Sequence, residues 1–210
     1  MKTVFLDLDG TLTDAGPGII RSVIHALDTL GIAAPPEAAL GWVVGPALLD
    51  SFAKLGVDDP HEALRLYRER YQVTGLFENA VYPGIPQALE AMQTRYRLCL
   101  ATAKPHVYAT RVTAHFRLDS HLEAQFGPEL DGTRNDKGAL LAHALETLGR
   151  EAADCLMVGD RHHDFDAARA VGMPSLGVAW GYGSAEELAR ATGRVDRPQA
   201  LADAVARMLG

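Results

Sequence analysis

The carboxylates near the start of the chain are the residues whose type and spacing most clearly indicate chemistry. Asp7 and Asp9 follow the apolar residues 4–6, which read as a buried strand, and Gly10 then lets the chain turn. Residues i and i+2 of a strand share one face, so the two carboxylates start out pointing the same way. Buried negative charges repel each other and resist the loss of water. A cation is therefore expected here, and Mg²⁺, which prefers oxygen ligands, is the natural candidate.

A second acidic pair follows another apolar run. Asp160 comes directly after residues 156–159, and Asp164 lies four residues further on, a spacing that suits one face of a helical turn. His162 and His163 lie between them and raise the possibility of zinc. The other expected ligands are carboxylates, and sites of oxygen ligands prefer Mg²⁺. The sequence therefore favours magnesium and leaves the two histidines as loop residues.

A hydroxyl and two amines complete the set of candidate residues. Thr102 ends an apolar run, and Pro105 opens the helix predicted after it. A hydroxyl beside a helix N-terminus can donate a hydrogen bond to a phosphate oxygen. Lys137 stands at the start of another predicted helix, where a positive charge is poorly placed for the helix dipole, and so invites a functional role. Lys104 competes with Lys137 for that role, because it lies two residues from Thr102.

Short apolar strands alternate with amphipathic helices along most of the chain. This alternation predicts an α/β fold with a doubly wound, Rossmann-like parallel sheet. Ligands of such sheets bind beyond the carboxyl ends of the strands, where Asp7, Thr102 and Asp160 are expected. The predicted strands are Val4–Leu8, Leu98–Thr102, Leu156–Gly159 and Ser175–Ala179.

The stretch from residue 15 to residue 82 breaks this alternation, because it contains only helix signals. Apolar side chains recur at helical spacing over residues 19–30, residues 46–55 read as a second helix, and Asp59 is a typical N-cap for a third. The stretch is predicted to be an all-helical insertion after the first strand. The predicted division is 15–82 for the insertion and 1–14 with 83–210 for the core.

Composition limits the classes of function. The chain has 210 residues, of which 48% are hydrophobic, and can bury a full core. Its net charge of −7 argues against a nucleic-acid partner. No apolar run reaches the roughly 18 residues of a membrane span, and the N-terminus lacks the features of a signal peptide. Cys99 and Cys155 fall in predicted core strands and are expected to stay unpaired, which fits a reducing cytoplasm.

The segment Asp7-Leu8-Asp9-Gly10-Thr11-Leu12 resembles the first motif of the haloacid dehalogenase superfamily, most of whose members are phosphatases. Thr102, Lys137 and the pair Asp160 and Asp164 are similar to its second, third and fourth motifs. Many relatives carry Asn after the motif hydroxyl, where this chain has Ala103. Residues 15–82 resemble the helical cap of the family, which opens to admit substrate and closes to exclude water. Tyr82-Pro83-Gly84-Ile85 and Gly181-Tyr182-Gly183-Ser184 look like the phosphoglycolate phosphatase-like branch.

The resemblance implies a Mg²⁺-dependent phosphatase that works through an aspartyl-phosphate. It makes Asp7 the nucleophile and Asp9 the acid and base, while Thr102 and Lys137 hold the transferring phosphoryl group. The implied metal ligands are Asp7, Asp160, Asp164 (directly or through water) and the main-chain carbonyl of Asp9. The implied substrate-binding residues are Gly10, Thr11, Thr102, Ala103 and Lys104 in the core and Arg21 and Gly45 in the cap.

The resemblance also implies a small phosphate monoester as substrate, because a closing cap leaves room for a small molecule only. Phosphoglycolate is the first expectation, with Arg21 or the turn at Gly45 and Pro46 as the candidates for binding its carboxylate. A nucleoside monophosphate is the second, with Trp42 or Phe52 as the candidates for stacking on the base.

Other functions remain open at this point. Within enzymes they are a sugar-phosphate phosphatase, a sugar-phosphate mutase and, ranked low, a phosphonate hydrolase, for which Lys54 is the only lysine of the insertion. Outside enzymes they are a phosphoacceptor signalling domain, which is shorter and has no cap, and a catalytically silent phosphate-binding protein. The expected assembly is a monomer or a homodimer.

Overall fold

The computed structural model describes residues 1–210, which divide into two compact units. The core unit consists of residues 1–13 and 81–210, and the helical unit consists of residues 14–80. The boundaries predicted from the sequence, after residues 14 and 82, fall within two residues of these divisions.

A parallel sheet of six strands forms the middle of the core unit, in the order β5-β4-β1-β6-β7-β8. The predicted Rossmann-like architecture is confirmed. The apolar first strand, β1, lies in the interior of the sheet between the strands that precede Thr102 and Asp160. The strands are β1 Thr3–Leu6, β4 Arg97–Ala101, β5 Ala124–Phe126, β6 Cys155–Gly159, β7 Ser175–Val178 and β8 Gly193–Val195.

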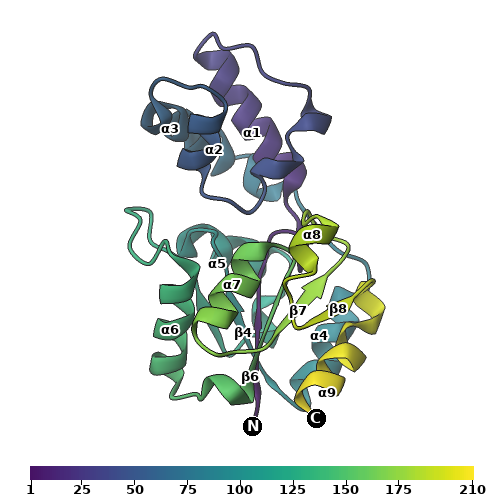
Figure 1. Ribbon diagram of the computed structural model, residues 1–210. Helices are drawn as coiled ribbons and strands as arrows, with labels where there is room; N and C mark the ends of the chain where they lie inside the picture. Colours follow the sequence, from purple (N-terminus) through teal and green to yellow (C-terminus); the bar gives the residue numbers. More distant parts are fainter. The chain divides into compact units, whose positions relative to one another are not determined.

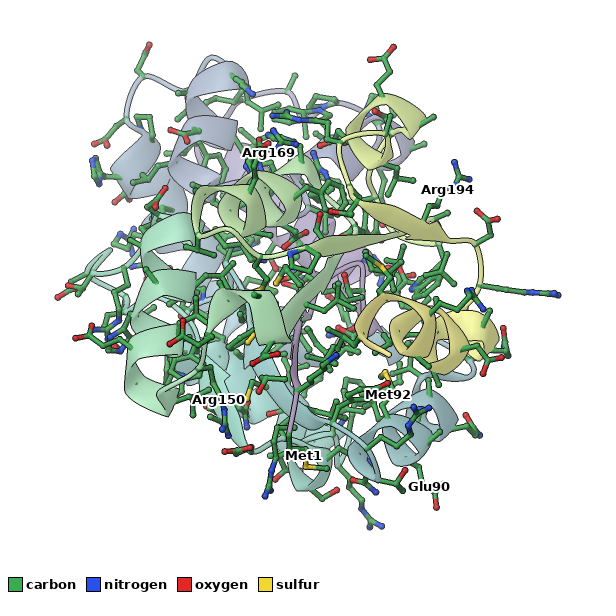
Figure 2. All side chains as sticks on the ribbon, turned by 60° about the horizontal axis from the view of Figure 1, so that its bottom comes forward. Met1, Glu90, Met92, Arg150, Arg169 and Arg194 are labelled. Carbon is green, nitrogen blue, oxygen red and sulfur yellow. The ribbon has the colours of Figure 1, made fainter.

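Helices cover both faces of this sheet (Figure 1). Two of them, α6 and α7, pack together over a cluster of buried side chains that includes Phe5 and Met157. Figure 1 shows α4 and α9 together on the other side of the sheet. Figure 2 illustrates the two faces of α4, from which Glu90 projects outward while Met92 is buried. The helices of the core unit are α4 Ile85–Gln93, α5 His106–His115, α6 Lys137–Leu148, α7 His162–Ala170, α8 Ala185–Leu188 and α9 Leu201–Leu209.

The two cysteines lie on the strands to either side of β1, as the predicted strand order requires. Cys99 is in register with Phe5 and Cys155 with Thr3, so β1 separates them. Both thiols are buried and free, as expected. The sequence predicted β1, β4, β6 and β7 but missed β5 and β8, which lie at the two edges of the sheet and are three residues long. Edge strands this short carry no continuous apolar run that a sequence pattern can reveal.

The helical unit contains α1 Gly16–Thr29, α2 Leu48–Lys54 and α3 Pro60–Tyr71. Asp59 caps α3 as predicted, since its side chain accepts hydrogen bonds from the backbone N–H groups of His61 and Glu62. Residues 15–82 are not entirely helical, however. Where the chain passes between the two units, β2 (Thr13–Asp14) and β3 (Ala80–Val81) form a two-stranded sheet. Two-residue strands give no periodic signal in a sequence.

No helix combines the length and the apolar composition that crossing a bilayer requires.

Candidate active site

Three buried carboxylates gather at the carboxyl ends of β1 and β6. Asp7 follows β1 and donates its backbone N–H to the carbonyl of Val158 at 2.9 Å, while Asp160 follows β6. Asp164 lies in the first turn of α7. One oxygen from each of the three carboxylates lies within 4.8 Å of the others. The structure therefore brings together Asp7, Asp160 and Asp164, which the sequence named as metal ligands.

Two glycines allow these carboxylates to approach so closely. A Cβ atom on Gly10 would lie 2.6 Å from the carboxyl carbon of Asp160, and Gly10 has a φ of +86°. A Cβ atom on Gly159 would lie 2.5 Å from the Cβ atom of Asp164. Both distances are shorter than van der Waals contact, so only glycine fits at these two positions.

Lys137 is the cation of the acidic cluster. It is the first residue of α6, after the N-cap Asp136, and its side chain is only 8% exposed. Its Nζ atom donates to Oδ1 of Asp7 at 2.8 Å and forms an ion pair with Asp164. Burial alone would lower the pKa of Lys137, but the negative charges of Asp164 and Asp7 outweigh it and raise the pKa. Lys137 is therefore charged at neutral pH, and its ammonium pairs with two of the three carboxylates of the cluster.

The excess of negative charge perturbs the two carboxylates of the β6–α7 turn. Burial, followed by repulsion from Asp164 and Asp7, raises the pKa of Asp160 well above its ordinary value. Burial raises the pKa of Asp164 to about 6, against the opposing charge of Lys137. Oδ1 of Asp160 is buried and has no hydrogen-bond partner. A divalent cation bound by these oxygens would offset the repulsion between the carboxylates and would give Oδ1 of Asp160 a partner. The residues therefore fit Mg²⁺, which prefers oxygen ligands.

Asp9 occupies a different environment from Asp7. Its carboxylate is not part of the acidic cluster, and its Oδ2 atom instead accepts a hydrogen bond from Nζ of Lys104 at 2.6 Å. Burial raises the pKa of Asp9, while the charge of Lys104 partly offsets this effect. The other oxygen, Oδ1, is buried without a hydrogen-bond partner. The two lysines that competed in the sequence analysis thus have separate partners, Lys137 for Asp7 and Lys104 for Asp9.

Thr102 directly follows β4, at the same edge of the sheet. Its Oγ1 atom accepts a hydrogen bond from the backbone N–H of Lys104 at 3.2 Å, which leaves the hydroxyl proton available for donation to a ligand. Ala103 has only a methyl side chain, so it can contribute only its backbone groups. Thr11 lies in the turn after Asp9, and its carbonyl accepts a hydrogen bond from Nε1 of Trp180 at 3.0 Å.

The two substrate-binding candidates of the helical unit are Arg21 and Gly45. Arg21 forms ion pairs with Glu37 and Glu78, each at 3.3 Å, and its charge is therefore already balanced. Gly45 has a φ of +106°, which suits a turn.

Two aromatic residues of the helical unit were named as candidates for stacking on a base. Phe52 is fully buried and packs edge-on against Tyr67 with ring centroids 6.4 Å apart, so it belongs to the core of the helical unit. Trp42 is partly exposed, with Nζ of Lys54 5.8 Å from its ring centroid.

The two histidines near Asp160 are not loop residues, because α7 begins at His162 and includes His163. The backbone N–H of Arg161 donates to Asp164 at 3.0 Å, and this cap starts the helix earlier than the sequence suggested. His162 pairs with Glu187. Burial lowers the pKa of His163 to about 4, which keeps it neutral.

Glu187 is a further residue near Asp160 that was not predicted from the sequence. Its carboxylate accepts from Nε of Arg161 at 3.1 Å and from the backbone N–H of Ser184 at 2.9 Å. Burial would raise the pKa of Glu187, but the hydrogen bonds with His162 and Ser184 and the charge of Arg161 outweigh it and lower this pKa to about 2. The spacing of Ser184 and Glu187 is that of a capping box, a signal that could have been read from the sequence.

Comparisons with known proteins match this chain to one family of hydrolases. Residues 4–178 match the model of the haloacid dehalogenase-like hydrolases. A protein of Pseudomonas aeruginosa named 5'-nucleotidase is 48% identical over 189 residues, which cover 88% of this chain and 86% of the relative. A phosphoglycolate phosphatase of Cupriavidus necator is 30% identical, with 85% of this chain and 81% of the relative covered.

Two further matches cover almost the whole chain. The tyrosine-protein kinase PtkA of Mycobacterium tuberculosis is 36% identical over 211 residues, which cover 100% of this chain and 72% of the relative. The crystal structure of a predicted phosphatase from Clostridium acetobutylicum superposes with a TM-score of 0.94 at 34% identity, and 98% of each chain is covered.

Proposed function

We infer that this chain, which belongs to the haloacid dehalogenase-like hydrolase family, is a Mg²⁺-dependent phosphatase that hydrolyses small phosphate monoesters through an aspartyl-phosphate on Asp7. The observation that carries this proposal is the pairing of Asp7 with Lys137 at 2.8 Å inside a buried cluster of three carboxylates. The hydrogen bond from Lys137 orients the carboxylate of Asp7, as a nucleophile requires.

Asp7, Asp160, Asp164 and the main-chain carbonyl of Asp9 are the groups that would hold Mg²⁺. When bound, the ion would neutralise phosphate oxygens and so allow one anion to approach another. The sequence named the same ligands, and the unpartnered Oδ1 atom of Asp160 supports an ion here.

In the first step, a carboxylate oxygen of Asp7 attacks phosphorus in line with the ester oxygen. The bond from Asp7 to phosphorus forms while the bond from phosphorus to the leaving oxygen breaks. Asp9 gives its proton to that oxygen, so the alcohol leaves neutral. The raised pKa of Asp9 supports this role, because a buried carboxyl is more readily protonated at the start of the cycle. Thr102 and Lys137 donate hydrogen bonds to the remaining phosphoryl oxygens.

In the second step, Asp9 is ionised and takes a proton from water as the water attacks phosphorus. The bond between phosphorus and Asp7 breaks, inorganic phosphate leaves, and Asp7 and the protonated Asp9 are restored. Lys104, which donates to Asp9 at 2.6 Å, stabilises the ionised form that this step needs.

Two substrate classes have support. A nucleoside 5'-monophosphate is favoured by the relative named 5'-nucleotidase, at 48% identity. Phosphoglycolate, the first expectation from the sequence, is supported by the more distant relatives of that name. Arg21 was a candidate for binding the carboxylate of phosphoglycolate, but its ion pairs with Glu37 and Glu78 make it a weaker one. We therefore place nucleoside 5'-monophosphates first.

The test is release of inorganic phosphate with Mg²⁺ present, measured for nucleoside 5'-monophosphates, phosphoglycolate and sugar phosphates. A tenfold difference in kcat/KM, about 1.4 kcal/mol of transition-state preference, would rank the classes. Asp7→Asn, purified in parallel, controls for contaminating phosphatases. If inorganic phosphate is released from none of these esters, the proposed phosphatase activity is wrong. If the chain instead transfers phosphate from ATP to a tyrosine-containing peptide faster than it releases phosphate from these esters, the result would support the activity in the name of the mycobacterial relative.

A further inference from the structure

Glu187, on α8 of the core unit, connects the turn after Asp160 to a loop that follows β7. Its carboxylate accepts from Nε of Arg161 at 3.1 Å and pairs with His162, the two residues directly after Asp160. The same carboxylate accepts from the backbone N–H of Ser184 at 2.9 Å. Glu187 itself is not among the carboxylates of the acidic cluster.

The loop that Glu187 holds makes a direct contact with Asp160. The backbone N–H of Tyr182 donates to Oδ2 of Asp160 at 2.7 Å. The other oxygen, Oδ1, is buried and has no hydrogen-bond partner. Because one oxygen is engaged, the orientation of the carboxylate is fixed, and Oδ1 is the atom left for an ion.

Two glycines of this loop show how closely it passes Asp160. A Cβ atom on Gly181 would lie 2.5 Å from Oδ2 of Asp160. A Cβ atom on Gly183 would lie 3.1 Å from the carbonyl carbon of the same residue. The loop therefore follows both the side chain and the main chain of Asp160, and any shift of the loop moves the N–H donor of Tyr182.

We propose that Glu187 is a positioning residue for the metal site, which holds the Gly181–Ser184 loop on Asp160 so that Oδ1 of Asp160 stays available to a divalent cation. Glu187 acts through Arg161, His162 and the loop, and touches neither the ion nor the substrate. The proposal rests on the proposed function only for the identity of the ion as Mg²⁺. Groups that orient the ligands of a metal commonly change its affinity by roughly 10–100-fold when removed.

The test is the dissociation constant of Mg²⁺, measured by calorimetric titration of the whole chain without substrate. Glu187→Ala removes every hydrogen bond of this carboxylate and is expected to raise the Kd roughly 10–100-fold. Glu187→Gln keeps the size but loses the charge, and is expected to raise the Kd by a smaller factor. Glu186→Gln is the matched control, because Glu186 is exposed on the same helix and loses the same charge. Its Kd is expected to equal that of the unsubstituted chain.

Activity provides a second readout. If Glu187 acts by positioning, saturating Mg²⁺ restores kcat in Glu187→Ala while the Mg²⁺ concentration for half-maximal rate stays raised. A purely structural role would lower the thermal midpoint without changing the Kd, and that result overturns the proposal. If Glu187→Ala does not fold, an unchanged Kd in Glu187→Gln overturns it equally, as does absence of Mg²⁺ binding to the unsubstituted chain. Because the titration needs no turnover, a failure to hydrolyse phosphate esters would refute the phosphatase and leave this result interpretable.

Discussion

Asp7 and Asp9 are two residues apart and chemically identical, yet the fold gives them different surroundings. Asp7 lies beside Lys137 in a cluster with two other carboxylates, whereas Asp9 is paired with Lys104. Neither lysine is near the aspartates in the sequence. In the proposed mechanism, the nucleophile Asp7 and the proton carrier Asp9 thus differ in the lysine with which each is paired. Substitutions of the two aspartates should therefore have different effects.

Asp7→Asn is expected to abolish phosphate release, because an amide is neither the nucleophile nor a good ligand for Mg²⁺. Asp9→Asn is expected to bind Mg²⁺ nearly normally, since its carboxylate lies outside the acidic cluster. Its kcat should still fall by roughly 10²-fold or more through the loss of acid and base catalysis. Calorimetric Mg²⁺ titration and steady-state rates of both variants check these outcomes, and near-normal turnover in Asp7→Asn would rule out the assignment.

Lys104→Met is expected to slow the second chemical step more than the first. Lys104 lowers the pKa of Asp9, so its removal raises that pKa further and reduces the ionised fraction at a given pH. The acid side of the pH profile of kcat should therefore move to higher pH, and aspartyl-phosphate should accumulate on acid quenching. Lys54→Met, in the helical unit, serves as the control. An unchanged pH profile in Lys104→Met would show that Lys104 does not act on Asp9.

At the scale of the elements, what could be predicted depended on burial. The strands β1, β4, β6 and β7 are buried over all or all but one of their residues, and the sequence indicated all four. The helical stripe of α1 and the Asp59 cap of α3 were equally readable. Segments that lack their own periodic pattern, such as β3 and β5, take their conformation from neighbours that a local sequence window does not contain.

Within the helical unit, Glu78 joins the end of the unit to its first helix. Its carboxylate accepts two hydrogen bonds from Arg70, at 2.8 and 3.1 Å, and one from Arg21 at 3.3 Å. Its backbone carbonyl accepts from the N–H of Gly18 at 3.0 Å. The hydrogen bonds from Arg70, more than the charge of Arg21, lower the pKa of Glu78.

Glu78→Gln is expected to lower the free energy of unfolding by about 1 kcal/mol at pH 7, as for a partly exposed, bidentate ion pair. The sign follows from the lowered pKa: the stabilisation is complete above the ordinary value of 4.5 and is lost as pH falls through the folded-state pKa. Urea unfolding at pH 7 and at pH 3 measures the difference in unfolding free energy, which should be smaller at the lower pH. Glu69→Gln, whose more exposed side chain pairs with Arg65, should have a smaller effect. Equal losses at both pH values would contradict the argument.

At the scale of the whole molecule, the candidate site draws on segments that begin at residues 7, 102, 137 and 160. The sequence could place Asp7, Thr102 and Asp160 at one edge of the sheet, because the ends of parallel strands meet there. It could not assign Lys104 to Asp9, or Glu187 to Arg161 and His162, since both pairings form only after the loops are folded. A role of Arg21 or Gly45 in binding substrate stays a prediction from the resemblance, and the partners of Arg21 are Glu37 and Glu78 of its own unit.

Mg²⁺ is expected to stabilise the whole core unit. At a concentration 100 times the Kd, binding adds about 2.7 kcal/mol, and the thermal midpoint should rise by roughly 5–10 °C. Asp160→Asn should abolish this rise. Without Mg²⁺, the same variant should be at least as stable as the unsubstituted chain, because it removes a repelling buried charge whose pKa is raised. Scanning calorimetry with Mg²⁺ and with chelator makes the comparison. A thermal midpoint of the unsubstituted chain that does not change with Mg²⁺ would contradict the prediction.

The position of β1 has a consequence for how the protein is made. A ribosome synthesises β1 first, but its partners in the sheet are residues 97–100 and 155–158, which come much later. Pairings across such distances form slowly, and apolar strands that wait for them are exposed to aggregation. The helical unit, which is continuous in sequence from residue 14 to residue 80, can fold in the meantime. Asp7 reaches its position only when β6 has emerged, so the nascent chain has no assembled acidic cluster until Asp160 and Asp164 have been translated.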